Sequence, residues 1–192
     1  MDVIISRYIG IRGTAIMARA RYDELKKRYP EWFLVEAMSF DEGLDDINEL
    51  PEIGIAMNEG ASYAKGYTEF GIFEALFQMS KELRCGLRIR IKDIPIKQET
   101  VEVCEELKCN PYALFAGGSS VIVCENGEVM KEVLEKNGIP ASIVGHTTKD
   151  NDKIVINEDE ESFLPHIRKD EMKNVLGRKE YNDIVQNMNS LE

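Results

Sequence analysis

The sequence predicts an α/β or α+β domain, a mixed β-sheet with helices packed on it. Two observations carry this prediction. Short apolar runs, such as residues 119–124, are interspersed with longer segments of helical periodicity. Residues 87–92 alternate apolar with basic side chains, the period of two that is typical of a half-buried strand. At 192 residues the chain is long enough for one well-buried core.

The chain opens with a predicted buried strand at residues 3–5. A turn with Gly10 and Gly13 follows, and Thr14 is expected to cap a helix that runs to about Tyr29. Pro30 stands where a second helix would begin, the acidic segment 41–49 is expected to be a surface connection, and Pro51 is expected to start a third helix.

The segment from Gly60 to Ser80 is the most informative. A short strand at 61–65 leads into a turn, and Thr68 is expected to cap the helix that follows. The apolar positions from Phe70 to Met79 are too many for one narrow stripe, so this helix should be largely buried.

The rest of the chain continues the alternation of helices and strands. A helix is predicted at about 98–108, a strand at 119–124 after the break at Gly117-Gly118, a helix at 127–137 ended by Gly138, two paired strands at 141–144 and 153–156, and helix from about Phe163 onwards. We expect one domain over residues 1–175 and a charged helical tail over 176–192.

The charge and hydrophobicity of the sequence limit the classes of partner that we expect. The formal net charge of −11 disfavours nucleic acid and anionic membranes, and the basic run from Arg19 to Arg28 is interleaved with acids as a solvated helix face would be. No apolar stretch approaches the roughly 20 residues that span a bilayer, and the N-terminus does not resemble a signal peptide. We therefore expect a cytoplasmic location, where the four cysteines would be reduced thiols.

Glycine-rich turns are the candidate ligand sites. The turn formed by Lys65, Gly66, Thr68 and Gly71 precedes a helix whose first backbone N–H groups could face a phosphate. Glu69 in that turn would repel an anion, so a capped core helix without a ligand is the alternative.

Two further turns leave the same choice open. Gly117, Gly118 and Ser119 precede a strand, and Gly10, Gly13 and Thr14 precede a helix. Glycine permits both positive φ and close approach of another group, so each turn could contact a ligand or simply pack tightly.

The sequence shows no motif for a zinc site or for acid–base catalysis. The spacing of Cys104 and Cys109 does not suit zinc, and Cys104 falls on the apolar side of a helix, which favours a buried thiol. Neither histidine has a ligand partner nearby in sequence, and no pair of carboxylates stands out as acid and base. We predict no metal site and name no catalytic residue.

Four segments in order resemble the C-terminal domain of AIR-synthase-related proteins and HypE-type hydrogenase maturation factors. They are IISRYIGIRGTAIMARA, GYTEFGIFEALFQMS, IPIKQETVEVCEELKCNPYALFAGGSSVIVC and the segment from Gly138 to Gly145. Together they extend over about residues 3–175. Each motif alone is weak, and their shared order carries the resemblance.

The resemblance implies a three-layer α/β/α fold of the AIR-synthase (PurM) C-terminal type. It also implies ATP-dependent activation of an amide-like or carbonyl oxygen, as in the cyanide-ligand chemistry of the hydrogenase factors. In that family an N-terminal domain supplies most contacts to ATP and magnesium. Both are therefore expected here only with a partner domain, and no cofactor is expected in isolation.

This sequence departs from the family pattern in three respects. The resemblance covers only the C-terminal half. The family's aspartate of Asp-x-Thr aligns with Gly66, and the first glycine of its pair aligns with Phe70. The hydrogenase factors carry their thiocarbamate on a C-terminal cysteine, whereas this sequence ends with Leu191-Glu192.

Three interpretations remain open. The chain could dock on a separate ATP-binding domain and complete its cleft, act as a non-catalytic binding or regulatory domain, or be part of a longer protein. In each case a face that normally meets the N-terminal domain needs a cover, so we expect a homo-oligomer, a partner, or an adapted polar surface.

Overall fold

The computed structural model describes residues 1–42 and 50–189, and within them one mixed seven-stranded sheet organises the chain. The order across the sheet is β2-β4-β1-β5-β3-β6-β7. The strands are β1 (Asp2–Ser6), β2 (Tyr63–Gly66), β3 (Gly86–Arg90), β4 (Ser120–Cys124), β5 (Ala141–Thr148), β6 (Lys153–Asn157) and β7 (Glu160–Phe163).

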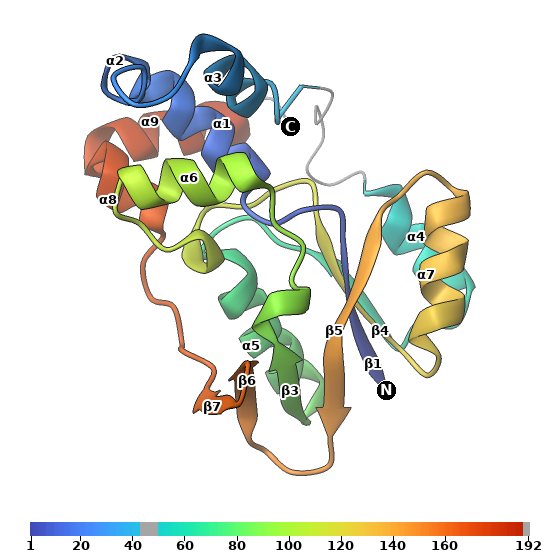
Figure 1. Cartoon of the computed structure of the whole chain (residues 1–192). Helices are drawn as coiled ribbons and strands as arrows, with labels where there is room; N and C mark the ends of the chain where they lie inside the picture. Colours follow the sequence, from blue (N-terminus) through green and yellow to red (C-terminus); the bar gives the residue numbers. More distant parts are fainter. Residues whose placement is uncertain (43–49, 190–192) are drawn as a thin grey trace.

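Helices cover both faces of the sheet and one of its ends. In Figure 1, α5 lies on one face, α4 and α7 lie on the other, and the remaining helices gather beyond one end. The helices are α1 (Ile11–Ala20), α2 (Tyr22–Leu25), α3 (Glu31–Met38), α4 (Pro51–Asn58), α5 (Gly71–Leu83), α6 (Gln98–Glu106), α7 (Gly127–Lys136), α8 (Glu171–Leu176) and α9 (Arg178–Asn189). This is the three-layer α/β/α arrangement that the family resemblance implies, with a helical cap added.

The central strands β1 and β4 are buried on both faces, which explains their continuous apolar runs. Val3 and Ile5 of β1 belong to the core under α5, while Ile4 belongs to the core under α4 and α7. The same alternation holds for Val121 and Ile122 of β4. Side chains of a strand point alternately to opposite faces, so a strand between two helical layers needs apolar residues throughout.

The predicted pairing of residues 141–144 with 153–156 is wrong, because β3 lies between β5 and β6. Strand β3 runs antiparallel to β5 and parallel to β6. Its buried residues Leu87 and Ile89 lie in the core under α5. The connection 149–152 crosses two inter-strand spacings of roughly 4.8 Å each, a distance that a few extended residues span easily.

Helix α1 begins earlier than predicted. Gly10, with φ 65°, is its N-cap, and Thr14 lies inside the helix instead of capping it. The buried Thr14 hydroxyl is 2.8 Å from the carbonyl oxygen of Gly10 and 3.0 Å from the Thr100 hydroxyl of α6. The predicted helix to Tyr29 is also interrupted, at Arg21, where α2 follows as a separate short helix.

The C-terminal region is less helical than predicted. Residues 160–163 form β7, which pairs antiparallel with β6, and helix resumes only at Glu171. Met172 and Leu176 of α8 and Tyr181 of α9 are buried against α1, α3 and α6 in one apolar cluster. These two helices therefore pack as part of the globular structure.

Several other predictions are confirmed. Helix α5 is largely buried, with Ile72, Leu76 and Met79 fully enclosed. Cys104 is buried in α6, and Gly138 has the positive φ of a glycine at a helix end. Most of the predicted surface connection at 41–49 lies outside the described residues. Among the described helices, none has the length and apolar character needed to cross a membrane.

Replacing Gly13 by alanine should destabilise the chain by about 2–4 kcal/mol. A Cβ there would lie 2.5 Å from the carbonyl oxygen of Phe115 and 2.8 Å from Cγ of Leu114, although alanine is the better helix former. Gly54→Ala is the matched control in α4, because a Cβ there meets nothing within 4 Å. Urea unfolding should show Gly54→Ala as neutral or stabilising. Equal effects of the two substitutions would contradict the close contact.

Candidate functional site

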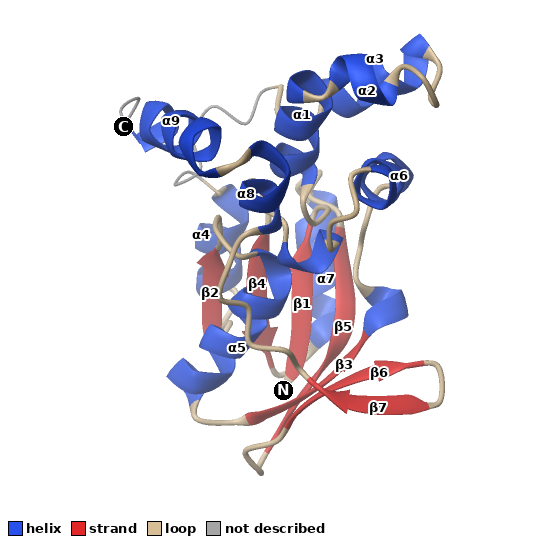
Figure 2. Ribbon diagram, turned by 90° about the vertical axis from the view of Figure 1, so that its left-hand side faces the viewer, coloured by secondary structure: helices blue, strands red, loops and turns tan. Residues whose placement is uncertain are grey.

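Three connections meet at the end of the sheet that faces the helical cap. They are residues 7–10 after β1, residues 67–70 after β2, and the segment 110–119 before β4. The sheet register brings them together, because Gly66 pairs with Ser120 and Ile5 pairs with Val121. Figure 2 shows this end of β1, β2 and β4 below helices α1 and α8.

Direct hydrogen bonds join the segment 110–119 to the connection 67–70 and to the first turn of α1, which follows the connection 7–10. The Ala116 N–H donates to the Thr68 carbonyl at 2.6 Å, and the Gly13 N–H donates to the Phe115 carbonyl at 3.1 Å. The Ser119 hydroxyl bonds the buried Tyr67 hydroxyl at 2.9 Å. The structure thus brings the candidate turns to the same end of the sheet. The residues concerned are Gly10, Gly13, Thr14, Gly66, Thr68, Gly71, Gly117, Gly118 and Ser119, with Lys65 exposed on β2 beside them.

Close packing of backbone explains two of these glycines. A Cβ on Gly71 would lie 2.5 Å from the carbonyl oxygen of Tyr112, and Gly13 has the comparable contact with Phe115. Gly117 and Gly118 have positive φ, which other residues rarely adopt. The packing alternative therefore accounts for these glycines without a ligand, and a ligand role for them stays a prediction.

Thr68 does not cap α5, contrary to prediction. The N-cap is Phe70, with φ 65°, a conformation that costs a non-glycine residue energy. Its N–H donates to the carboxylate of Asp170 at 2.8 Å. An internal carboxylate, 100 residues away in sequence, thus binds where an external anion could approach this turn.

Asp170 ties the C-terminal segment to two of the three connections. One carboxylate oxygen accepts the N–H groups of Phe115 at 3.1 Å and Met172 at 2.9 Å, while the other accepts that of Phe70. The side chain is only 1% exposed. Burial raises the pKa of Asp170 to about 6, against the lowering effect of the three N–H donors.

A pocket of about 480 Å³ opens beside the 66–70 turn. Lys65, Gly66 and Thr68 line it together with Tyr63, Tyr67, Glu69, Phe70, Glu74, Ala75, Gln78, Glu82 and Val121. Burial raises the pKa of Tyr63 to about 12, so its phenol stays neutral at physiological pH. Lys65 is paired with Glu82 at 3.1 Å.

The charges of this pocket do not fit a triphosphate unaided. It contains one ammonium group and three carboxylates, of Glu69, Glu74 and Glu82. Within the described ranges, no three His, Cys, Asp or Glu side chains are grouped to hold a metal ion. Phosphate chemistry needs cations around the transferred group, and this wall supplies too few.

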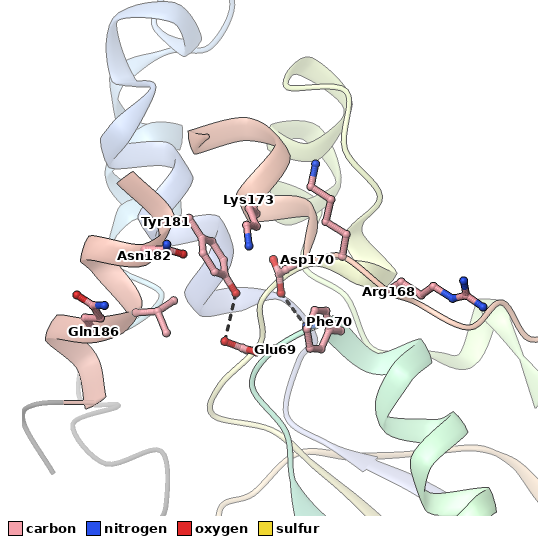
Figure 3. Close-up of a pocket in the computed structure, with 10 residues that line it drawn as sticks. Glu69, Phe70, Arg168, Asp170, Lys173, Tyr181, Asn182 and Gln186 are labelled. Atoms are coloured by element: carbon pink, nitrogen blue, oxygen red, sulfur yellow. Dashed lines mark hydrogen bonds between the residues drawn. The ribbon is translucent and has the colours of Figure 1, made fainter. Parts of the chain in front are cut away.

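A second pocket, of about 400 Å³, adjoins the first through Glu69 and Phe70 (Figure 3). Its other lining residues come from the segment 168–186. Figure 3 shows Lys173 between Tyr181 and Asp170, while the side chain of Arg168 points away from them.

A buried polar network supports the site from beneath. Glu52 of α4 is fully buried and pairs with Arg7 at 3.1 Å, and it accepts a hydrogen bond from Ser6 at 2.9 Å. Ser6 in turn bonds Ser120 at 3.0 Å. These contacts link α4 to the ends of β1 and β4. Breaking such a buried pair by removing one partner is generally costly.

Asp170, Glu52 and Lys173 are residues of this region that the sequence did not predict. An aspartate just before an apolar-periodic segment is a local signal for the α8 cap, and its Met172 contact could have been anticipated. The bonds to Phe70 and Phe115, and the pairing of Glu52 with Arg7, join residues far apart in sequence.

The sequence matches the family described as "AIR synthase related protein, C-terminal domain" over residues 3–157. The chain belongs to this family. A curated relative, a putative hydrogenase expression/formation protein of Methanocaldococcus jannaschii, is 29% identical over 114 residues. That alignment covers 57% of this chain and 33% of the relative.

Solved structures agree with this family fold. Escherichia coli HypE superposes with a TM-score of 0.66 at 18% identity, over 87% of this chain and 50% of that chain. A HypE–HypF complex gives 0.63 at 20% identity, over 85% and 52%. A ThiL structure described as complexed with AMPPCP and TMP gives 0.53 at 15% identity, over 83% and 48%. The chain spans about half the length of these structures and a third of the curated relative.

The pH dependence of stability should reveal the buried Asp170. A folded-state pKa of about 6, above the ordinary value of 3.8, means that the folded chain holds this proton more tightly than the unfolded chain. Stability should therefore fall as pH rises from about 4 to about 6, by roughly 3 kcal/mol, and this contribution should be constant above that range.

Asp170→Asn isolates this titration. Loss of one N–H acceptor should lower the stability of the variant by the same amount at every pH. Because the variant lacks the titrating carboxyl, its stability relative to wild type should rise between about pH 4 and pH 6. Urea unfolding of both chains at several pH values measures the difference. A difference that does not change between pH 4 and 7 would show that the three N–H donors outweigh burial.

Proposed function

We propose that this chain forms one wall of an ATP-dependent active site and completes it by pairing with an ATP-binding domain. The reaction class would be phosphoryl transfer to a carbonyl or amide oxygen, as in hydrogenase maturation. The observation that carries the proposal is the pocket lined by Lys65, Gly66 and Thr68 beside the connection 67–70, which is hydrogen-bonded to the segment 110–119.

The extent of the matches supports a paired role. The chain corresponds to about half of each HypE structure, and one HypE structure is described as a complex with ATP, at 13% identity and a TM-score of 0.62. One wall of a cleft is what half of such a protein would provide.

The charge of the pocket supports the same division of labour. With three carboxylates against one ammonium group, this wall repels a nucleotide on its own. A partner domain would have to bring the magnesium ion and most of the positive charge. The role left to this chain is to shape the cleft and exclude water from it.

A non-catalytic binding or regulatory domain is the second candidate. The Asp170 carboxylate already accepts the Phe70 N–H at the turn before α5. Phe70 also stands where the family pattern has a glycine. A turn whose N–H group is already bound by a carboxylate of the same chain could keep this conformation without any nucleotide.

The two candidates differ in what an ATP-binding domain does to the chain. An N-terminal ATP-binding domain of this family, encoded in the same genome, should form a complex with this chain that is detected by light scattering. The complex should bind a fluorescent ATP analogue about tenfold more tightly than either part alone, since closing the cleft adds contacts.

Charge reversal at the pocket provides the variant test. Lys65→Glu should weaken analogue binding by the complex about tenfold, because it places a further negative charge beside the phosphates. Lys81→Glu, on an exposed part of α5, is the control and should leave binding unchanged. Failure of the complex to form, or binding no tighter than that of the ATP-binding domain alone, would favour the second candidate.

A further inference from the structure

We infer that the pocket between the segment 168–186 and the Glu69–Phe70 turn binds a small organic anion. The ligand class is a phosphate or carboxylate group attached to an apolar, ring-sized body. Most of this site lies outside the family-matched residues 3–157, and it is complete within this chain. The inference therefore goes beyond the proposed function and does not depend on a partner domain.

The shape of the pocket suits a small molecule. Its volume of about 400 Å³ falls in the range of ligand sites, roughly 300–1,000 Å³. The walls come from α8, α9, the segment before α8 and the turn before α5. Asp170 fixes three of these parts relative to one another, because it bonds both Phe70 and Met172.

Positive charge gathers here in a strongly acidic chain. Arg168, Lys169 and Lys173 all line the pocket, and within the described ranges none of them forms an ion pair with a carboxylate. The chain as a whole carries a net charge of −11. Although the Arg168 side chain points away from Lys173 and Asp170 (Figure 3), unpaired cations at one pocket of such a chain create a local site for an anion.

Lys173 is the cation placed to meet the ligand. Its side chain is half-buried, and its ammonium group lies 5.3 Å from the centre of the Tyr181 ring. A cation–π contact orients the group without neutralising its charge. Figure 3 shows it facing the space between Tyr181 and Asp170.

The two carboxylates of the pocket already have partners. Asp170 accepts three backbone N–H groups, and Glu69 accepts the Tyr181 hydroxyl at 3.4 Å. Both are thus partly compensated, so their repulsion of an incoming anion is reduced. The ammonium group of Lys173 keeps three donors for a ligand.

The apolar and amide side chains of the pocket indicate what the rest of the ligand should be. Phe70, Tyr181 and Val185 provide ring and aliphatic surface, which favours an apolar body next to the anionic group. Asn182 and Gln186 are four residues apart on α9, so their exposed amides lie on the same side of the helix. These amides can bond a polar edge of the ligand.

Titration of the ¹⁵N-labelled full chain with phenyl phosphate, benzoate, inorganic phosphate and phenol tests the inference by NMR. Phenyl phosphate or benzoate should shift the signals of residues 168–186 with saturation in the millimolar range or below. Inorganic phosphate and phenol, which each carry half of the expected chemistry, should bind at least about tenfold more weakly. The stronger of the two ring-bearing anions identifies the head group.

Lys173→Gln should weaken binding about tenfold, since it removes a charge-assisted hydrogen bond. Lys169→Gln, at the exposed rim, should weaken it less. Lys179→Gln on the neighbouring helix α9 is the matched control, because Lys179 is exposed and does not line this pocket. The dispersion of the NMR spectrum shows whether each variant is folded.

Absence of saturable shifts with both ring-bearing anions would overturn the inference. So would equal weakening by Lys173→Gln and Lys179→Gln, which would indicate diffuse attraction to the surface. Phosphate binding as tight as phenyl phosphate would overturn the apolar part of the ligand class. None of these outcomes depends on an ATP-binding domain, so they are separate from the test of the proposed function.

Discussion

The buried carboxylate of Asp170 is the contact on which the arrangement of the site depends. It accepts N–H groups from Phe70, Phe115 and Met172, one from each of three segments that are distant in sequence. A carboxylate with three donors sets the positions of all three backbones at once, which apolar packing alone does less specifically. The turn before α5, the segment before β4 and the start of α8 are held in this way.

The meeting of these segments gives two glycines of the candidate turns a definite physical role. Gly13 and Gly71 let one backbone approach another, and the same approach brings two adjoining pockets to a single end of the sheet. One pocket is acidic and lies within the family-matched region, whereas the other is rich in cations and is built mostly from the segment after it. The two pockets therefore suit different ligands.

Much of the fold could be predicted because it follows from local patterns. Neighbouring residues alone indicate the apolar runs of β1 and β4, the burial of α5 and the helix end at Gly138. The predicted helix caps at Thr14 and Thr68 are wrong, because long-range packing competes with local propensity. Gly10 starts α1 earlier, and Asp170 supplies the acceptor at α5 from 100 residues away. The cation-rich pocket could not be predicted, because only the folded chain brings Lys173 next to Phe70.

The position of β3 between β5 and β6 has a consequence for how the chain reaches its native state. Strand β6 is joined to the rest of the sheet through β3, and β3 in turn pairs with β5, a strand made some fifty residues later during synthesis. The β6–β7 edge must then wait for a contact between distant segments, and such contacts form slowly. Until it forms, the apolar side chains of β3 lack one neighbour. An unpaired sheet edge of this kind is a template on which a second chain can pair wrongly during folding.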